Sequence, residues 1–231
     1  MPQRSMRERI AAVPVLGPAL RMIHQTYEGR KFRNSSTYWE QRYFSGGNSG
    51  AGSYGRLAMA KADFVNRLVE ERGIKTVLEL GCGDGNQLVL ARYPSYVGVD
   101  ISTIAVEACR ARFAGDTSKR FLVTGSEPLP ICELGLSLDV IYHLVEDDVF
   151  ERYMHDLLTH SSKLVVLYTS DSDVTPPSPA PHVRHRAVAR WMASRSDWRF
   201  KERLQNPYPF QEGHEDTTSF ADFYVYEKVH S

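Results

Sequence analysis

Glycine and acidic residues on either side of residue 85 have the spacing of a nucleotide-binding turn. In VLELGCGDGNQ, Gly81, Gly83 and Gly85 come directly after an apolar run, where a chain can turn sharply and let its backbone approach a ligand. Asp100 ends the next apolar run, about 20 residues further on, where a carboxylate can accept hydrogen bonds from ribose hydroxyls. A dinucleotide motif has a further glycine at the position that Asn86 fills here. The pattern therefore predicts a nucleotide-like ligand and disfavours NAD.

A histidine after a later apolar run has the chemistry of a general base. His143 lies in LSLDVIYHLVEDD, directly after the C-terminal end of an expected strand at 136–142, and imidazole titrates close to neutral pH. We expect His143 to accept the proton of a reacting hydroxyl; a structural, hydrogen-bonded histidine is the alternative. Asp139 is the second candidate catalytic residue, with three roles left open: it orients the imidazole, contacts a cofactor, or joins His143 in holding a divalent ion. These two side chains are fewer ligands than Mg²⁺ prefers, so we assign no metal ligands and keep Mg²⁺ dependence as the minor alternative.

The apolar pattern predicts the elements that position these residues. Apolar side chains recur at helical spacing from Arg56 until Gly73, and Ser102 is placed to cap a second helix that runs to Phe113. A third helix is expected with Phe150, Met154, Leu157 and Leu158 on one face. Short strands are expected at 76–80, 96–101, 121–123, 136–142 and 164–168. This alternation implies an α/β fold with a parallel sheet. Residues 198–204 and 220–229 have no helix pattern between them and predict an antiparallel hairpin.

The glycine turn and its flanking acids resemble the first motif of the class I S-adenosylmethionine-dependent methyltransferases. That motif is an acidic residue two positions before G-x-G-x-G, and Glu79 with Gly81 to Gly85 matches it. The resemblance covers about residues 54–229. It implies a Rossmann-like fold with a seven-stranded, mostly parallel sheet, an antiparallel C-terminal hairpin and helices on both faces. It also implies S-adenosyl-L-methionine as the cofactor, with the glycine turn under its methionine part, Asp100 on the ribose and Ile101 beside the adenine.

The resemblance implies further cofactor contacts. Together with the turn, they fall on Glu79, Gly81, Cys82, Gly83, Asp84, Gly85, Asp100, Ile101, Ser126, Ser137 and Leu138. The motif after the third strand departs from the family, which often has an acidic residue near the adenine amine where this chain offers Gly125, Ser126 and Glu127. Upstream, Tyr38 to Gly55 is rich in aromatic residues, glycine and serine, which predicts a loop that closes over the ligand or a plain linker. Tyr43 and Arg56 resemble residues that relatives place over the methionine part; Arg56 is equally well explained as a helix-surface cation.

The acceptor is predicted from weaker signals. Two blocks, YWEQRYFSGGNSGAGSYGRLA and SLDVIYHLVEDD, resemble bacterial sugar O-methyltransferases of polysaccharide assembly, including enzymes that act on methylmannose polysaccharide. Four side chains are suited to holding a polyhydroxylated acceptor, namely Tyr54, His182, Arg184 and His185, although the arginine is also explained as part of a solvated helix start. We therefore expect O-methylation of a small-molecule or oligosaccharide acceptor. The alternatives are a phenolic or other non-sugar acceptor, a catalytically inactive cofactor-binding scaffold and, less favoured, a nicotinamide-dependent oxidoreductase.

Composition limits the partners and the compartment. Lysine plus arginine and aspartate plus glutamate number 28 each among 231 residues, so no net charge would attract nucleic acid. The three cysteines fit neither a disulfide framework nor a zinc site, which favours the cytoplasm. No apolar run approaches the roughly 20 residues of a membrane span. We expect residues 1–37 to form a basic amphipathic extension, which makes a homodimer or, alternatively, attaches to anionic lipid, and residues 38–231 to form the methyltransferase domain.

Overall fold

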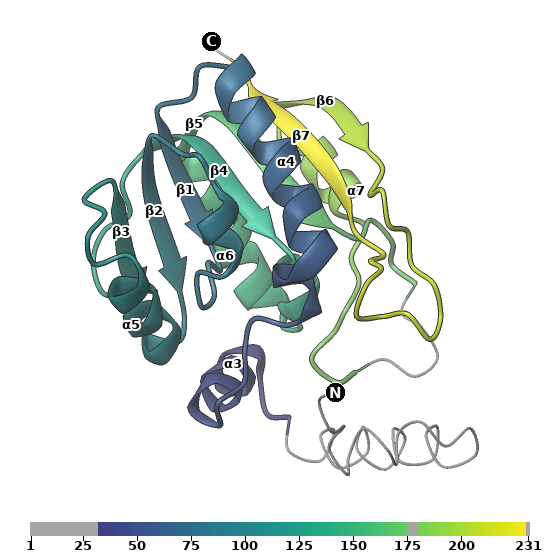
Figure 1. Ribbon diagram of the computed structural model, residues 1–231. Helices are drawn as coiled ribbons and strands as arrows, with labels where there is room; N and C mark the ends of the chain where they lie inside the picture. Colours follow the sequence, from purple (N-terminus) through teal and green to yellow (C-terminus); the bar gives the residue numbers. More distant parts are fainter. Residues whose placement is uncertain (1–31, 175–179, 230–231) are drawn as a thin grey trace.

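Strands form one seven-stranded sheet in the order β3-β2-β1-β4-β5-β7-β6 in this computed structural model, which describes residues 32–174 and 180–229 (Figure 1). The strands are β1 Thr76–Leu80, β2 Ser95–Asp100, β3 Lys119–Val123, β4 Cys132–Leu138, β5 Ser161–Thr169, β6 Trp198–Leu204 and β7 Asp222–Lys228. Strands β1 to β5 pair in parallel, and β7 lies antiparallel between β5 and β6. The predicted mostly parallel sheet with an antiparallel C-terminal hairpin is confirmed.

Helices cover both faces of this sheet. They are α3 Ser35–Phe44, α4 Gly55–Glu71, α5 Thr103–Arg112, α6 Asp147–Thr159 and α7 Val188–Ala193, with 3₁₀ turns η1 Ala51–Ser53, η2 Gln87–Leu90 and η3 Ile141–His143. On one face of the sheet, an apolar core contains Phe64 of α4, Leu88 of η2 and Val106 of α5. On the other face, a second core contains Met154 of α6 and Met192 of α7. The expected three-layer arrangement is therefore present.

Local sequence signals account for the helix ends. Helix α4 ends at Glu71, and Gly73 follows with φ +60°, the left-handed conformation that favours glycine after a helix. The Ser102 hydroxyl accepts a hydrogen bond from Ala105 N at 3.3 Å and so caps α5 as expected. Helix α5 thus begins directly after the end of β2, which carries the candidate site residue Asp100.

Two expected elements are wrong in part. The strand expected at 136–142 ends at Leu138, because Asp139 adopts φ +63° and the chain then forms η3. Aspartate tolerates this left-handed conformation better than most residues. The loop expected from Tyr38 to Gly55 is helical over Tyr38–Phe44, since α3 begins at Ser35 behind the cap Asn34, whose Oδ1 accepts from Thr37 N. Helix α3 thus crosses the predicted boundary between residues 37 and 38.

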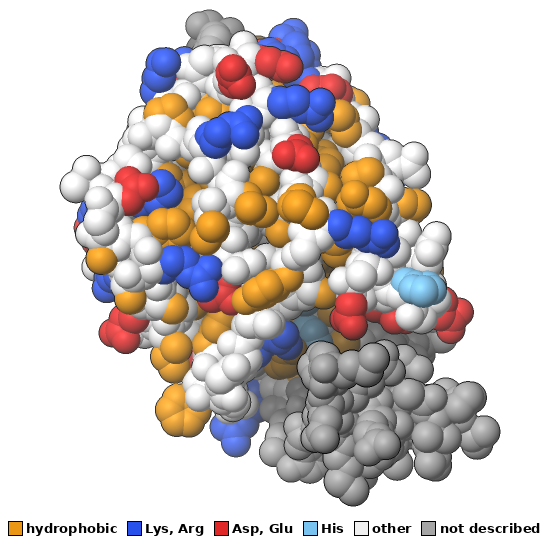
Figure 2. All heavy atoms as spheres, in the orientation of Figure 1, with side chains coloured by type: hydrophobic (Ala, Val, Ile, Leu, Met, Phe, Trp, Pro, Cys, Tyr) orange, Lys and Arg blue, Asp and Glu red, His pale blue; other side chains and the backbone are white. Residues whose placement is uncertain are grey.

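The carboxyl ends of the parallel strands share one edge of the sheet, where ligands bind in open α/β folds. In Figure 1 this is the lower edge, and α3 lies beneath it. The expected extension lies outside the described residues over 1–31. On the face that α4 covers, Figure 2 shows basic, acidic and apolar side chains interspersed. Within the described ranges, no helix has the length and apolar character to cross a membrane.

Candidate active site

The predicted glycine turn connects β1 to η2 at the carboxyl edge. Gly81 N and Cys82 N donate to Val99 O at 2.7 and 3.0 Å, which fixes the turn against β2. At Gly83, φ is +59° and a Cβ atom would lie 2.2 Å from Ser49 Oγ, so only glycine fits there without displacing its neighbour. Cys82 is buried below the turn.

Asp100 ties the glycine turn to the end of β2. Its Oδ2 accepts a hydrogen bond from Gly83 N and its Oδ1 accepts one from Ser102 N, both at 2.9 Å. Burial raises the pKa of this carboxyl group, against the lowering effect of the backbone donors. The structure therefore brings together the two features that the spacing of the sequence predicted, and Ile101 follows directly.

Glu79 lies inside the protein behind the turn. It is buried, and its Oε2 accepts a hydrogen bond from Tyr96 Oη at 2.7 Å. Burial raises the pKa of Glu79 to about 7, although the Tyr96 hydroxyl and the Lys61 charge lower it. Tyr96 was not expected at the site, because a tyrosine in a strand is indistinguishable from a core residue in the sequence.

Residues 45–54, here called the strap, pack on the glycine turn. Ser49 N and Tyr54 Oη both donate to Asp84 Oδ2, at 3.2 and 2.8 Å, and Asp84 N donates to Ser49 Oγ at 2.9 Å. Burial opposes ionisation of Asp84, but these donors and Asn86 N outweigh it and lower the pKa. Tyr43 Oη lies 2.9 Å from Ser49 Oγ, and its contact with the cofactor stays a prediction. Tyr54, predicted to bind the acceptor, anchors the strap to the turn through its hydrogen bond to Asp84.

Asp139 is held by groups that sequence reasoning missed. Its Oδ2 forms an ion pair with Lys61 Nζ of α4, and its Oδ1 accepts a hydrogen bond from Tyr142 Oη at 2.7 Å. Lys61 is 1% exposed. A lysine in an amphipathic helix is normally solvent-facing, so only the fold reveals this pair. Of the roles left open for Asp139, direct orientation of His143 has no hydrogen bond to support it in the described part of the chain.

His143 lies in η3 with one ring nitrogen engaged. Nδ1 is 3.0 Å from His182 O, and because a carbonyl only accepts, Nδ1 carries the proton and Nε2 has the lone pair. Within the described residues Nε2 has no hydrogen-bond partner. Burial lowers the pKa of His143 to about 4, so the ring is neutral at pH 7. The Trp39 ring meets it edge-on, with centroids 5.0 Å apart.

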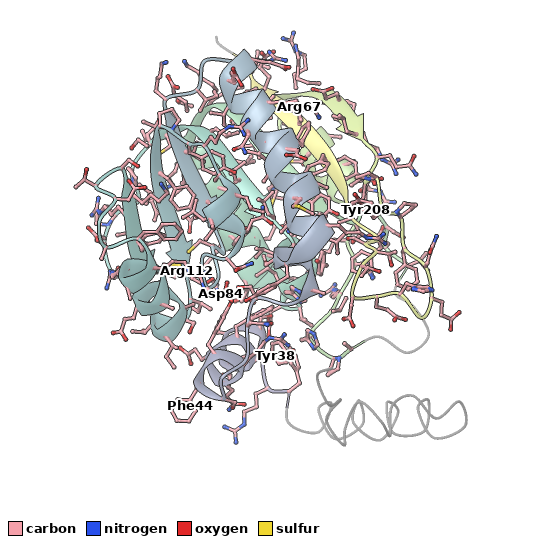
Figure 3. All side chains as sticks on the ribbon, in the orientation of Figure 1. Tyr38, Phe44, Arg67, Asp84, Arg112 and Tyr208 are labelled. Carbon is pink, nitrogen blue, oxygen red and sulfur yellow. The ribbon has the colours of Figure 1, made fainter. Side chains whose placement is uncertain are left out.

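His182 belongs to the same aromatic cluster. Its ring stacks on Tyr38 of α3 with centroids 4.1 Å apart and lies 5.4 Å from the ring of His143. Its Nδ1 is buried and has no hydrogen-bond partner among the described residues. Burial lowers the pKa of His182 to about 3. Figure 3 shows Tyr38 and Asp84 together at the edge beneath the sheet, which places the aromatic cluster on the same side as the glycine turn.

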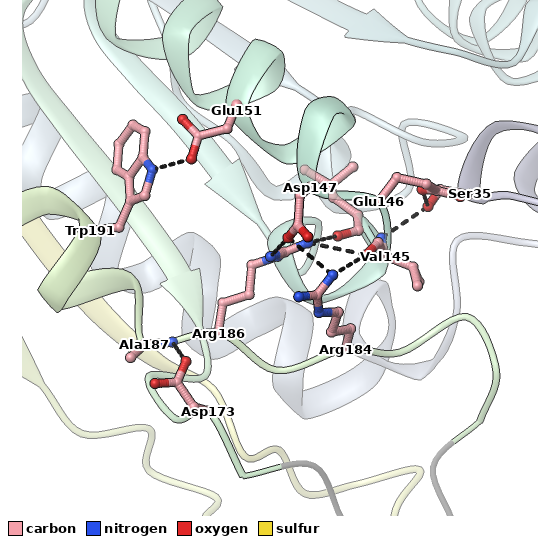
Figure 4. Close-up of polar contacts among 11 residues, drawn as sticks. Ser35, Val145, Glu146, Asp147, Glu151, Asp173, Arg184, Arg186, Ala187 and Trp191 are labelled. Atoms are coloured by element: carbon pink, nitrogen blue, oxygen red, sulfur yellow. Dashed lines mark hydrogen bonds and ion pairs between the residues drawn. The ribbon is translucent and has the colours of Figure 1, made fainter.

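Two other predicted acceptor residues, Arg184 and His185, form hydrogen bonds within the protein. Arg184 Nη1 donates to Val145 O at 2.8 Å and pairs with Asp147 at 3.0 Å, so it fixes the loop after η3 (Figure 4). Ser35 of α3 holds the same loop, because Val145 N donates to its Oγ at 3.0 Å. His185 is buried, and its Nδ1 lies 2.7 Å from Ser170 Oγ. Both side chains thus have partners within the protein, and acceptor binding by Arg184 and His185 stays a prediction.

The remaining predicted cofactor residues are spread along the edge. Ser137 is buried, with its Oγ 2.7 Å from Tyr153 Oη, and Leu138 ends β4 beside it. Ser126 is exposed in the turn after β3. Arg56 turns toward the β6–β7 connection, where its Nε donates to Thr217 O at 2.6 Å. The described residues contain no group of three or more side chains that could hold a metal ion.

Comparison with known proteins relates this geometry to methyltransferases. No family model and no curated protein matches the chain. Among solved structures, the N-methyltransferase NodS from Bradyrhizobium japonicum WM9 with S-adenosyl-L-homocysteine has a TM-score of 0.64 at 13% identity, over 86% of this chain and 100% of that one. Magnesium protoporphyrin IX methyltransferase from Synechocystis PCC 6803 with bound S-adenosylmethionine has 0.60 at 14%, over 86% and 99%. The methyltransferase domain of bacterial CtHen1 has 0.57 at 15%, over 73% and 97%. The chain therefore has the fold of the class I S-adenosylmethionine-dependent methyltransferases.

Proposed function

We propose that this protein is an S-adenosylmethionine-dependent O-methyltransferase whose acceptor is a saccharide hydroxyl in polysaccharide biosynthesis. The observation that carries the proposal is the shared edge of the sheet. Asp100 is hydrogen-bonded to the glycine turn there. A neutral His143, whose Nε2 has no hydrogen-bond partner among the described residues, follows strand β4, which pairs with β1. The fold is shared with methyltransferases of several acceptor classes. The similar structures support methyl transfer but do not select an acceptor.

The residues at the glycine turn fit the cofactor. Gly83 lets the backbone turn with φ +59° beneath Ser49, and Asp100 presents a carboxylate at the position where a ribose is held. The strap, with Tyr43 and Ser49, would cover the methionine part. When bound, S-adenosylmethionine supplies a methyl group on a positively charged sulfur, which an oxygen nucleophile can attack.

His143 supplies the acid–base chemistry in this proposal. An alcohol keeps its proton near neutral pH, so a base that takes it during attack lowers the barrier. His182 O fixes the tautomer of His143 and so leaves Nε2 free to accept that proton. The Lys61–Asp139 pair holds the end of β4 and thereby the position of η3. The Trp39 and Tyr38 rings border the imidazole cluster and exclude water from one side.

The Trp39 and Tyr38 rings support a sugar acceptor, because aromatic faces pack against the apolar faces of a pyranose. A phenolic acceptor is the second candidate, since the stacked rings of Tyr38 and His182 would equally receive an aromatic substrate. Mg²⁺ remains a condition to vary in the assay.

Calorimetric titration tests the cofactor assignment first. S-adenosylmethionine and S-adenosylhomocysteine should bind with micromolar affinity, NAD should not bind, and Asp100→Ala should weaken binding because the ribose loses its carboxylate partner. Binding of NAD alone would overturn the proposal. With the cofactor established, methyl transfer to saccharides and to phenols, each with and without Mg²⁺, separates the two acceptor classes.

A further inference from the structure

A surface cavity lies on the other side of the strap from Asp139. It has a volume of about 440 Å³ and opens between the strap, the first turn of α4 and residues 216–217 of the β6–β7 connection. Gly52 separates the two sides, since a Cβ atom there would meet Asp139 Oδ2, whereas Gly50 and Tyr54 line the cavity. The cavity is thus next to the candidate active site but is not part of the glycine turn.

Two arginines, Arg42 and Arg56, line this cavity without an ion-pair partner among the described residues. Arg42 Nε donates to Asn48 O at 2.6 Å, and Arg56 Nε donates to Thr217 O at the same distance. The Arg56 guanidinium also lies 4.3 Å from the centre of the Tyr208 ring. These partners are neutral, and in the described part of the chain neither arginine forms an ion pair with a carboxylate. Each guanidinium is therefore held in place with N–H donors left for a ligand.

The surroundings add to the positive character of the cavity. Helix α4 has 17 residues, its N-cap Tyr54 gives no side-chain hydrogen bond, and its first turn has no acidic residue. The N–H groups of that turn carry partial positive charge. Asp216 is the carboxylate that lines the cavity, so two full positive charges face one negative charge.

We propose that this cavity binds an oxyanion, a phosphate or carboxylate group, carried by the acceptor. The link to the acceptor rests on the proposed function. Arg42 Nη1 donates to Tyr38 Oη at 3.2 Å, Tyr38 stacks on His182, and His182 O fixes His143. An acceptor with its hydroxyl at His143 would present an anionic substituent to Arg42 across the Tyr38 ring. The favoured substrate class is accordingly an anionic saccharide, such as a sugar phosphate or a uronic acid.

Inorganic phosphate and pyrophosphate are the probes for the site itself. Titration of the whole protein at low ionic strength should show saturable binding, and Arg42→Gln and Arg56→Gln should each weaken it about tenfold through the loss of a charged hydrogen bond. The matched control is Arg67→Gln, an exposed arginine on the same helix α4 (Figure 3). Absence of saturable binding, or equal weakening in the control, overturns the proposal.

The competing role for these arginines is to bind the carboxylate of the cofactor, and S-adenosylhomocysteine tests it. We expect its affinity to stay within about twofold in both variants. If it falls while adenosine affinity is unchanged, the arginines serve the cofactor and the anion site is refuted. If the wild-type protein binds phosphate but neither S-adenosyl compound, the proposed function fails while the anion site stands.

Discussion

An ion pair between the Lys61 ammonium and the Asp139 carboxylate joins helix α4 to the end of β4. The two side chains are 2% and 14% exposed, so the pair is largely removed from water. Asp139 has φ +63° and stands where β4 gives way to the turn that carries His143. The pair therefore holds the chain in an unusual backbone conformation directly before the candidate base.

Removal of the lysine charge should destabilise the protein. Lys61→Met leaves the Asp139 carboxylate without its cation, and a buried charge without its partner costs about 3 kcal/mol or more. Urea denaturation measures the free energy of unfolding. The double variant Lys61→Met with Asp139→Asn removes both charges. Its free energy of unfolding should therefore fall less than that of the single variant. A loss below about 1 kcal/mol in Lys61→Met would show that water already solvates this pair.

The sequence predicts those parts of the site whose residues lie close together in the chain. The glycine turn and Asp100 were predictable because each lies at a strand end, where one short motif specifies both the turn and its ligand. Lys61 was missed because its partner Asp139 lies 78 residues away in the sequence. The contacts of Arg184 with Val145 and Asp147 were missed for the same reason, since these residues become its neighbours only in the fold. Ion pairs between residues that are distant in the sequence therefore cannot be predicted from periodicity and spacing.

The role of His143 predicts a separation of turnover from binding. His143→Asn should lower methyl transfer about a hundredfold, because the hydroxyl proton loses its acceptor, and should leave S-adenosylhomocysteine affinity unchanged. His160→Asn is the control, since His160 Nδ1 contacts Asp156 O at the far end of α6. Single-turnover rates and calorimetry on both variants provide the two readouts. Undiminished turnover in the His143 variant would leave this histidine with a structural role.

The same histidine predicts a pH-dependent contribution to stability. The pKa of His143 is about 4 in the folded protein against an ordinary value of 6.5, so the unfolded chain takes up the proton first as pH falls. The stabilising effect is present above pH 6.5 and is lost as pH falls toward 4. From pH 7 to pH 5, the difference in unfolding free energy between wild type and His143→Asn should shrink by at most about 2 kcal/mol.

Denaturation of both proteins at several pH values measures this difference. The pKa of Glu79 is raised to about 7, so this residue makes the folded protein more stable as pH falls, opposite to His143. Because Glu79 is present in both proteins, its effect cancels in the difference between wild type and variant. A difference that does not change between pH 7 and pH 5 would mean that the His143 imidazole is solvated in the folded state.

The contact between the strap and Gly83 predicts that a side chain at position 83 weakens cofactor binding. A methyl group at Gly83 would lie 2.2 Å from Ser49 Oγ and 3.0 Å from Tyr43 Oη, and φ of +59° adds strain for any residue with a Cβ. Gly83→Ala should therefore push the strap off the turn, accelerate hydrogen exchange of the strap amides and weaken S-adenosylhomocysteine binding about tenfold or more. Gly115→Ala is the control, because no atom lies within 4 Å of its added methyl group. If Gly83→Ala matched this control in exchange and affinity, the strap would have no part in holding the cofactor, and its contacts with Asp84 would serve only the stability of the turn.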